Sequence, residues 1–312
     1  MKMKNILILG AGGDIGQSVF KILNDYNWIG NIIGTDINLN TASRLLFDKL
    51  YQIPKCNEKE YLNSIKKIIE KESIDNILPI SEPEIRFFHQ KKIRLIGKTP
   101  LILANDLALS VGLDKMSTYE FLKINNLPCP KTQYLNLPLE LDFPFIAKSN
   151  QGSGSKKIFI VKDNLDLDYL KNKYPQHILQ EFLPEQEGEY TCGLFRSSRG
   201  EIRHVVFKRE LLNGFSVFGE VIENKMINSL LIKLANLLDL NGSINIQLRL
   251  VEGVPYIFEI NPRFSSTVRF RDLIGFKDLL WVLQDFMNEN ISFNDGKLKG
   301  TKFYKGFNEY IL

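Results

Sequence analysis

The chain has 312 residues, of which 44% are hydrophobic and 24% charged, and it carries a net charge of +4 at pH 7. This length predicts at least two packed units, and the small net charge with dispersed lysines offers no track for a nucleic acid. No apolar run is long enough to span a membrane or to form a signal peptide, so we expect a cytoplasmic protein with no membrane partner.

The cysteines and histidines exclude several kinds of site. Cys56, Cys129 and Cys192 lie far apart, in a spacing that matches neither a disulfide framework nor a metal motif. The three histidines are equally dispersed, which gives no support to a zinc site or to a Ser–His–Asp triad. We expect the cysteines to be free thiols.

The N-terminal third alternates between strand and helix patterns. Residues 5–9 form a buried-strand run, the glycine-rich stretch 10–16 follows, and a helical pattern covers residues 17–24. A second strand ends at Asp36. A strand, a glycine turn and a helix are the start of a Rossmann-like unit. A further helix and strand, over residues 58–71 and 76–80, extend this parallel-sheet domain from residue 1 to about residue 105.

The glycine turn leaves an alternative function open. Gly10, Gly13 and Gly16 follow the spacing of NAD(P)-dependent sugar epimerases and dehydrogenases, and Asp36 stands where a ribose-binding carboxylate would be. Those enzymes also use a Tyr-x-x-x-Lys pair, which occurs here twice and therefore discriminates poorly. The alternative, which the weak motif favours, is a turn that only connects a strand to a helix.

The middle of the chain contains a lysine-bearing hairpin. Asp114 is placed to cap a helix over residues 115–125. A strand over residues 143–148 then ends at Lys148, the Gly/Ser-rich loop 149–157 follows, and a second strand covers residues 158–161. Such a loop can present N–H groups and hydroxyls to phosphate oxygens. The alternative is a surface hairpin, and Lys148 favours phosphate binding.

Residues 178–191 predict a strand followed by an extended acidic segment. Its main chain could meet the edge of an adenine, and a later carboxylate could take the ribose hydroxyls. An acidic turn would have the same pattern, so these residues alone leave both possibilities open.

Residues 243–267 predict a hairpin with oxygen-bearing side chains on one face. If residues 252–254 form the loop, Gln247 lies opposite Glu259, and Glu259 shares its face with Asn261. Such oxygen ligands suit Mg²⁺, and Arg263, directly after Pro262, can address a phosphate or a carboxylate. The alternative is an ordinary hairpin with polar residues in solvent.

Four motifs together resemble the ATP-grasp superfamily. The segments DK…TYEFLK…PCPKT, PFIAKSNQGSGS, QEFLPEQEGEYT and NIQL…FEINPRF occur in the superfamily's order between about residues 110 and 290. They are most similar to its carbamoyl-phosphate-synthase-like branch. The resemblance implies an α/β protein with a Rossmann-like pre-ATP-grasp domain (1–105) followed by a two-lobed α+β ATP-grasp domain (106–312). Its small lobe would cover about 115–180, and its large lobe about 181–290 with the C-terminal tail.

The resemblance also implies a role for each motif residue. ATP and Mg²⁺ (one or two ions, or Mn²⁺) would be the cofactors, with the metal on Gln247, Glu259 and Asn261. Arg263 and one of Lys208 and Arg209 would act at the transferring phosphoryl group. The ATP contacts would be Lys115, Lys148, Gly152, Ser153, Gly154, Ser155, Gln180, Glu181, Phe182, Leu183 and Glu189.

Two departures affect these assignments. Extra residues before Glu189 mean that Glu187 and Glu189 could exchange the ribose role, and Ser265–Ser266 replaces the glycines that often follow Asn-Pro-Arg. The resemblance covers one grasp unit, so we do not expect carbamoyl phosphate as the product.

The activity that the resemblance implies is ligation. The expected enzyme is an ATP-dependent carboxylate–amine (or carboxylate–thiol) ligase that forms an acyl phosphate from a small carboxylic or amino acid. Its partners would be small-molecule carboxylate and amine substrates, and similar enzymes are commonly homodimers. The alternatives are the NAD(P) enzyme described above and a non-catalytic ATP-binding protein.

Overall fold

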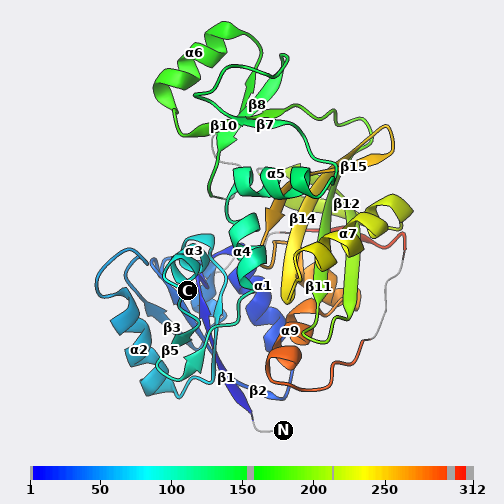
Figure 1. Cartoon of the computed structure of the whole chain (residues 1–312). Helices are drawn as coiled ribbons and strands as arrows, with labels where there is room; N and C mark the ends of the chain where they lie inside the picture. The colour runs from blue at the N-terminus through cyan, green and yellow to red at the C-terminus, as the bar shows by residue number, and fades with distance from the viewer. Residues whose placement is uncertain (1–2, 153–157, 213, 294–298, 307–312) are drawn as a thin grey trace.

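The computed structural model describes residues 3–152, 158–212, 214–293 and 299–306. Figure 1 shows three units: an N-terminal α/β unit, a small sheet with one helix, and a large sheet flanked by helices. Among the described helices, none has the length and apolar character needed to cross a membrane.

The N-terminal unit is a four-stranded parallel sheet, as the sequence predicts. Its strand order is β3-β2-β1-β4, and all three pairings are parallel. The strands are β1 (Lys4–Leu9), β2 (Ile29–Asp36), β3 (Lys49–Gln52) and β4 (Asn76–Pro79). The connecting helices are α1 (Asp14–Leu23), the 3₁₀ turn η1 (Ala42–Leu45), α2 (Tyr61–Glu72) and α3 (Glu82–Gln90). The short hairpin of β5 (Leu95–Ile96) and β6 (Thr99–Pro100) ends the unit.

The strand order of this unit creates a crevice. The chain leaves β1 towards β2 on one side and later adds β4 on the other, so the order reverses between β1 and β4. Ligands of open α/β sheets bind at such a point, beyond the carboxyl ends of the strands. The glycine turn that follows β1 and Ser81, which follows β4, lie at this crevice.

The small sheet contains the predicted lysine-bearing hairpin. Its order is β7-β10-β8-β9, with the antiparallel neighbours β8 and β9 on either side of the Gly/Ser-rich loop. The elements are β7 (Thr132–Tyr134), β8 (Phe145–Ser149), β9 (Phe159–Val161), α6 (Asn164–Lys173) and β10 (His177–Glu181). Part of that loop, residues 153–157, is outside the described residues, and it includes the candidates Ser153, Gly154 and Ser155.

The large sheet has the strand order β15-β14-β11-β12-β13-β16. Its strands are β11 (Glu189–Arg196), β12 (Ile202–Leu212), β13 (Phe215–Ile222), β14 (Gly242–Val251), β15 (Val254–Asn261) and β16 (Lys302–Tyr304). Its helices are α7 (Lys225–Leu237), α8 (Val268–Leu273) and α9 (Asp278–Phe286), and α4 (Asp106–Gly112) and α5 (Lys115–Ile124) lead into the small sheet.

The two faces of the large sheet have different cover. Buried apolar residues of α7 and α4 pack with Cys192, Leu194 and Ile246 of the sheet in one cluster. On the other face, α9 packs against Phe195 and Phe207, in a cluster that continues to α1 of the N-terminal unit. The large sheet is therefore joined to the N-terminal unit by a continuous apolar core.

The register of the β14–β15 hairpin confirms one prediction and corrects another. Gln247 pairs with Glu259, and Asn245 pairs with Asn261. The turn, however, is only Glu252–Gly253, both with positive φ, and not the three-residue loop predicted from the sequence. A bulge between Gln247 and Leu248 shifts the register by one residue and restores the predicted pair.

Candidate active site

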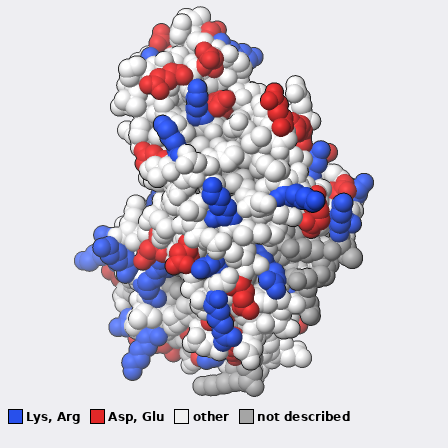
Figure 2. All heavy atoms as spheres, turned by 45° about the vertical axis from the view of Figure 1, so that its right-hand side comes forward, with Lys and Arg blue, Asp and Glu red and all other residues white. Residues whose placement is uncertain are grey.

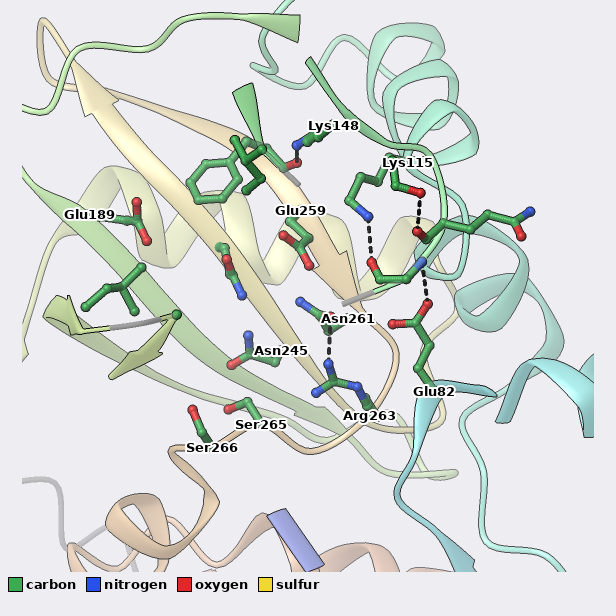
Figure 3. A pocket seen from close by; sticks show the side chains of 18 of the residues that line it. Glu82, Lys115, Lys148, Glu189, Asn245, Glu259, Asn261, Arg263, Ser265 and Ser266 are labelled. Carbon is green, nitrogen blue, oxygen red and sulfur yellow. Dashed lines mark hydrogen bonds between the residues drawn. The ribbon is translucent and has the colours of Figure 1, made fainter. Parts of the chain in front are cut away.

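One cavity, of about 880 Å³, lies where the three units meet. It is lined by most of the residues that the sequence assigns to a site: Lys115, Lys148, Gly152, Gln180, Glu181, Phe182, Leu183, Glu189, Arg209, Gln247, Glu259, Asn261 and Arg263. It also reaches the glycine turn and Ser81 of the N-terminal unit. Figure 3 shows the carboxylate of Glu259 between the amine of Lys148 and the guanidinium of Arg263.

Lys148 is a buried cation at the end of β8. Its side chain is only 6% exposed, and its amine donates to Gln180 Oε1 at 2.7 Å and to the carbonyl oxygen of Phe258 at 3.4 Å. Burial lowers the pKa of Lys148 to about 8, although the nearby Glu259 carboxylate acts in the opposite direction. The protein alone neutralises the positive charge of Lys148 poorly, which favours a polyanionic ligand in the cavity.

Lys115 is the first residue of α5, and the cap predicted for this helix is present. Asp114 accepts a hydrogen bond from Ser117 N at 2.9 Å, which fixes the start of the helix. The Lys115 amine donates to the carbonyl oxygen of Gly152 at 2.8 Å, and Gly152 N donates to Glu82 of the N-terminal unit at 3.1 Å. Lys115 therefore lies beside the start of the Gly/Ser-rich loop.

The paired residues of the hairpin supply oxygen ligands of the kind that Mg²⁺ prefers. Gln247 lies directly opposite Glu259, and Asn261 follows two residues later on β15. Burial raises the pKa of Glu259, but Lys115, Lys148, a hydrogen bond from Asn261 and Arg263 outweigh it, so the net pKa is lowered. One ionised carboxylate with two amides fits a metal that takes its remaining ligands from phosphates and water. The residues present therefore suit Mg²⁺.

Arg263 is held in position by its own chain. Its guanidinium donates to the carbonyl oxygen of Phe264 at 2.9 Å and to Asn261 Oδ1 at 3.2 Å. Burial lowers the pKa of Arg263, and the negative charges of Glu82 and Glu259 oppose that shift. The guanidinium is thus oriented at the boundary between the oxygen-bearing residues of the hairpin and the crevice of the N-terminal unit.

Of the two candidate basic residues on β12, Arg209 and Lys208, only Arg209 lines the cavity. Arg209 lines the cavity and donates to Gln247 Oε1 at 2.9 Å and to Glu189 Oε1 at 2.7 Å. Lys208, the next residue on β12, is exposed and is not among the cavity residues, because neighbouring side chains on a strand face opposite sides. Its side chain instead lies against Gly188. Of these two residues, Arg209 is therefore the one that can reach a ligand in the cavity.

Glu189 lies in the cavity, whereas Glu187 does not. The Glu189 carboxylate pairs with Arg209 and with Arg249, each at 2.7–2.8 Å. Glu187 accepts a hydrogen bond from Gly253 N at 3.1 Å, at the turn of the hairpin. Of the two acids that the sequence leaves interchangeable, Glu189 is the one placed to meet a ligand.

The end of the cavity beside Glu181–Leu183 is largely apolar. Ile146, Ile158, Ile160 and Phe258 line it together with Leu183. The carbonyl oxygen of Leu183 accepts from Arg249 Nη1 at 2.7 Å, and Gln180 is committed to Lys148. This combination of apolar side chains and main chain suits a planar base, with Gln180 serving the lysine.

Asn245 and Arg249 are among the cavity residues that were not singled out from the sequence. Asn245 is fully buried, accepts a hydrogen bond from Thr191 at 2.9 Å, and has no partner for its Nδ2 among the described residues. Arg249 orients Glu189. Both occupy alternate positions of β14 with Gln247, so the strand period could have revealed them once Gln247 was placed.

The dinucleotide alternative fits the glycine turn poorly. Gly12 N donates to Asp36 Oδ2 at 2.8 Å, so the acid that would bind a ribose is already bonded to the turn. A Cβ on Gly12 would lie 2.7 Å from the same oxygen.

Comparison with known proteins identifies both domains. Residues 113–267 match the ATP-grasp domain family, and residues 6–100 match the family described as PylC-like, N-terminal domain. Carbamoyl-phosphate synthase of Methanobrevibacter smithii is 25% identical over 185 residues, which are 55% of this chain and 49% of that protein. The chain thus spans about half the length of this relative.

Solved structures share the fold across both domains. N5-carboxyaminoimidazole synthetase from Staphylococcus aureus, complexed with ADP, has a TM-score of 0.75 at 15% identity, covering 94% of this chain and 79% of that one. The biotin carboxylase domain of Hydrogenobacter thermophilus 2-oxoglutarate carboxylase, crystallised with MgADP, ADP and bicarbonate, has a TM-score of 0.72 at 15% identity, covering 96% and 73%. The predicted fold class is confirmed, with an ATP-grasp domain matched over residues 113–267 and a PylC-like N-terminal domain matched over residues 6–100.

Proposed function

We propose that this protein is an ATP-dependent ligase that joins a small carboxylic or amino acid to an amine through an acyl phosphate. The observation that carries the proposal is the convergence of Lys148, Glu259, Asn261 and Arg263 in one cavity. The buried Lys148 and the half-buried Arg263, on either side of an ionised carboxylate, are suited to a polyphosphate whose charge shifts during transfer.

The cavity residues would divide the work as follows. The apolar end beside Leu183 would hold the adenine, and Glu189 would accept the ribose hydroxyls. Lys115 and Lys148 would bind the phosphates, with Arg209 nearby. Bound Mg²⁺, held by the oxygens of the β14–β15 hairpin, would neutralise charge on the β- and γ-phosphates.

Arg263 would orient the substrate acid for attack on the γ-phosphorus. The acid's oxygen forms a bond to phosphorus while the bond to the ADP oxygen breaks, which leaves an acyl phosphate. The amine then attacks the acyl carbon, a C–N bond forms, and phosphate leaves. No protein nucleophile is needed, and enclosure by the cavity would limit hydrolysis of the intermediate.

The relatives support the nucleotide and the metal. The Staphylococcus aureus enzyme was crystallised with ADP, and the Hydrogenobacter thermophilus domain with MgADP. The proposal takes only the nucleotide and metal from these complexes and leaves the acid and the amine unassigned.

An ADP-release assay with panels of acids and amines tests the proposal. A ligase releases ADP only when both a competent acid and a competent amine are present, and mass spectrometry should find the amide. ADP release that depends on neither substrate contradicts the proposal. ATP binding without consumption under any pair supports the non-catalytic alternative, and calorimetric binding of NAD(P) at the glycine turn would support the dehydrogenase alternative.

A further inference from the structure

The cavity continues beyond the phosphate-binding residues to the crevice of the N-terminal unit. Its wall there includes Gly10, the first turn of α1, and Ser81, all beyond the carboxyl ends of β1 and β4. Arg263 and Ser266 line the same region from the other domain. The second substrate of a ligase has to reach the acyl phosphate from a side that the nucleotide leaves free, and this crevice is such a side.

A chain of three hydrogen-bonded side chains stands behind this wall. Ser81 Oγ donates to Glu84 Oε2 at 2.5 Å, and Tyr61 Oη donates to Glu84 Oε1 at 2.8 Å. Glu84 is only 7% exposed and Tyr61 is fully buried. Gly10, at φ +74°, packs on this chain so closely that a Cβ would lie 2.8 Å from Ser81 Cβ. Because glycine has no side chain, Gly10 leaves room for the hydrogen-bonded Ser81–Glu84 pair.

The local sequence would normally produce a different arrangement. Ser-x-x-Glu at the start of a helix is the pattern of a capping box, in which the serine oxygen accepts from the backbone N–H three residues later. Here Ser81 makes no such side-chain cap. The Ser81 hydroxyl donates its proton to the Glu84 carboxylate. Towards a ligand, the Ser81 oxygen can therefore act only as a hydrogen-bond acceptor.

Glu84 also differs from the other acids around the cavity. Glu259 lies between lysines, Glu189 pairs with two arginines, and Glu82 pairs with Arg86 at 2.7 Å. The partners of Glu84 are two neutral hydroxyls.

The ionisable groups around Glu84 leave it able to accept a proton. Burial raises the pKa of Glu84 to about 6. The hydrogen bonds from Ser81 and Tyr61 oppose this shift, and the negative charge of Asp36 adds to it. Burial also raises the pKa values of Tyr61 and Cys56, which face Glu84, so both remain protonated. At neutral pH the carboxylate is ionised and can take up a proton.

The geometry points to Ser81 as the hydrogen-bond acceptor for the amine of the second substrate, with Glu84 behind it receiving that amine's proton. This inference rests on the proposed ligase function. An ammonium N–H of the substrate donates to Ser81 Oγ. The ammonium proton passes to the Ser81 oxygen while the Ser81 hydroxyl proton passes to the Glu84 carboxylate. The freed nitrogen lone pair attacks the acyl phosphate, the C–N bond forms, the C–O bond to phosphate breaks, and the leaving phosphate takes the second proton. Ser81 touches the substrate, and Glu84 is a positioning residue that acts through it.

A direct titration tests the contact without requiring turnover. Protein labelled with ¹³C at the glutamate carboxyl carbon is titrated by NMR, with the Glu84 signal assigned from its loss in Glu84→Gln. An ammonium at Ser81 should lower the titration midpoint of Glu84 for at least one of the proteinogenic amino acids added with MgADP. Ser81→Thr should keep this response, and Ser81→Ala should lose it. If no amino acid in the panel moves the midpoint, the inference is overturned.

A coupling measurement tests the proton transfer. With an acid and an amine that the wild type joins, Glu84→Gln should keep ADP release while the amide formed per ADP falls by about 10²-fold, since uncaptured acyl phosphate hydrolyses. Hydroxylamine, already unprotonated at neutral pH, should react equally well in both proteins. Glu72→Gln is the control, because Glu72 is also buried and bonded to a tyrosine, Tyr51, but its side-chain partners, Tyr51 and Lys49, do not line the cavity as Ser81 does.

The outcomes separate this inference from the proposed function. A Glu84→Gln protein with the amide-to-ADP ratio and pH profile of the wild type overturns the relay. ADP release that needs no acid overturns the ligase function instead, and the titration then still decides whether an amine contacts Ser81.

Discussion

Gln247 of β14 lies directly opposite Glu259 of β15 because Phe258 is an extra residue in the ladder between them. Neighbouring residues on a strand normally face opposite sides, and Ile257 accordingly packs in the core with Leu248. At the bulge, Phe258 and Glu259 both line the cavity. The bulge thus places the carbonyl oxygen that accepts from Lys148 and the Glu259 carboxylate next to each other in the cavity.

Glu259→Gln should reduce Mg²⁺-dependent ATP turnover by about 10²-fold or more, because it replaces the hairpin's one carboxylate among the metal ligands with a neutral group. The shape of the side chain is kept, so thermal unfolding should change little. ADP release at saturating Mg²⁺ measures the effect. Glu252→Gln, at the turn of the same hairpin, is the control and should behave as the wild type. Unchanged turnover in Glu259→Gln would refute the metal assignment.

Two adjacent substitutions on β12 test which cation serves the site. Arg209→Gln removes the guanidinium that holds Gln247 and Glu189, and we expect ATP affinity to fall about tenfold, the size of one charged hydrogen bond. Lys208→Gln removes an equal charge one residue away, outside the cavity, and should leave affinity unchanged. Isothermal titration with ATP distinguishes them. Equal losses in both variants would indicate a general charge effect and contradict the placement.

ATP binding should weaken as the pH rises above about 8. The pKa of Lys148 in the free protein is lowered to about 8 by burial, whereas phosphates beside the amine would keep it protonated. Binding above pH 8 therefore takes up a proton, and the dissociation constant should rise about tenfold per pH unit there and stay level below. Lys148→Met should bind weakly and without this pH dependence. A wild-type affinity that stays level from pH 7 to pH 10 would exclude Lys148 as a phosphate ligand.

Glu84 should lower the stability of the folded protein at neutral pH. Its pKa is raised by burial to about 6 from 4.5, so the folded state holds this proton more tightly than the unfolded state. Stability from this group is present below pH 4.5 and is lost as the pH rises through 6, in total about 2 kcal/mol. Glu84→Gln should therefore be more stable than the wild type at pH 7 by up to that amount.

Urea unfolding at pH 7 and at pH 4.5 measures this difference. Most of the gain should disappear at the lower pH, where Glu84 is neutral in the folded state. A Glu84→Gln protein that is less stable at pH 7 would show that Glu84 is ionised without penalty.

The number and surface distribution of charged residues do not reveal which charges belong to the proposed site. Figure 2 shows Lys and Arg interspersed with Asp and Glu over one face. The buried Lys148 and the half-buried Arg263, which matter most for the proposed site, lie in the cavity and do not stand out in such a surface pattern. Their importance depends on burial, and composition carries no information about burial.

The sequence by itself determined the local elements and the order of the motifs. The alternation over residues 244–250 and 255–261 predicted two strands, and their pairing brought Gln247 to Glu259. Asp114 marked the start of α5, and the end of β8 was predicted at Lys148, one residue before its observed end at Ser149, because caps and strand ends depend on neighbouring residues.

Only the tertiary structure decided what lies across the domain boundary. The choice of Arg209 over Lys208 depends on which face of β12 meets the cavity. Glu189 begins β11 inside the cavity, whereas Glu187 lies before that strand and bonds to the turn of the β14–β15 hairpin. Ser81, far from every motif in sequence, lines the cavity with Glu84 behind it, because β4 pairs beside β1. Such contacts join residues whose separation along the chain leaves no periodic signal, so packing alone brings them together.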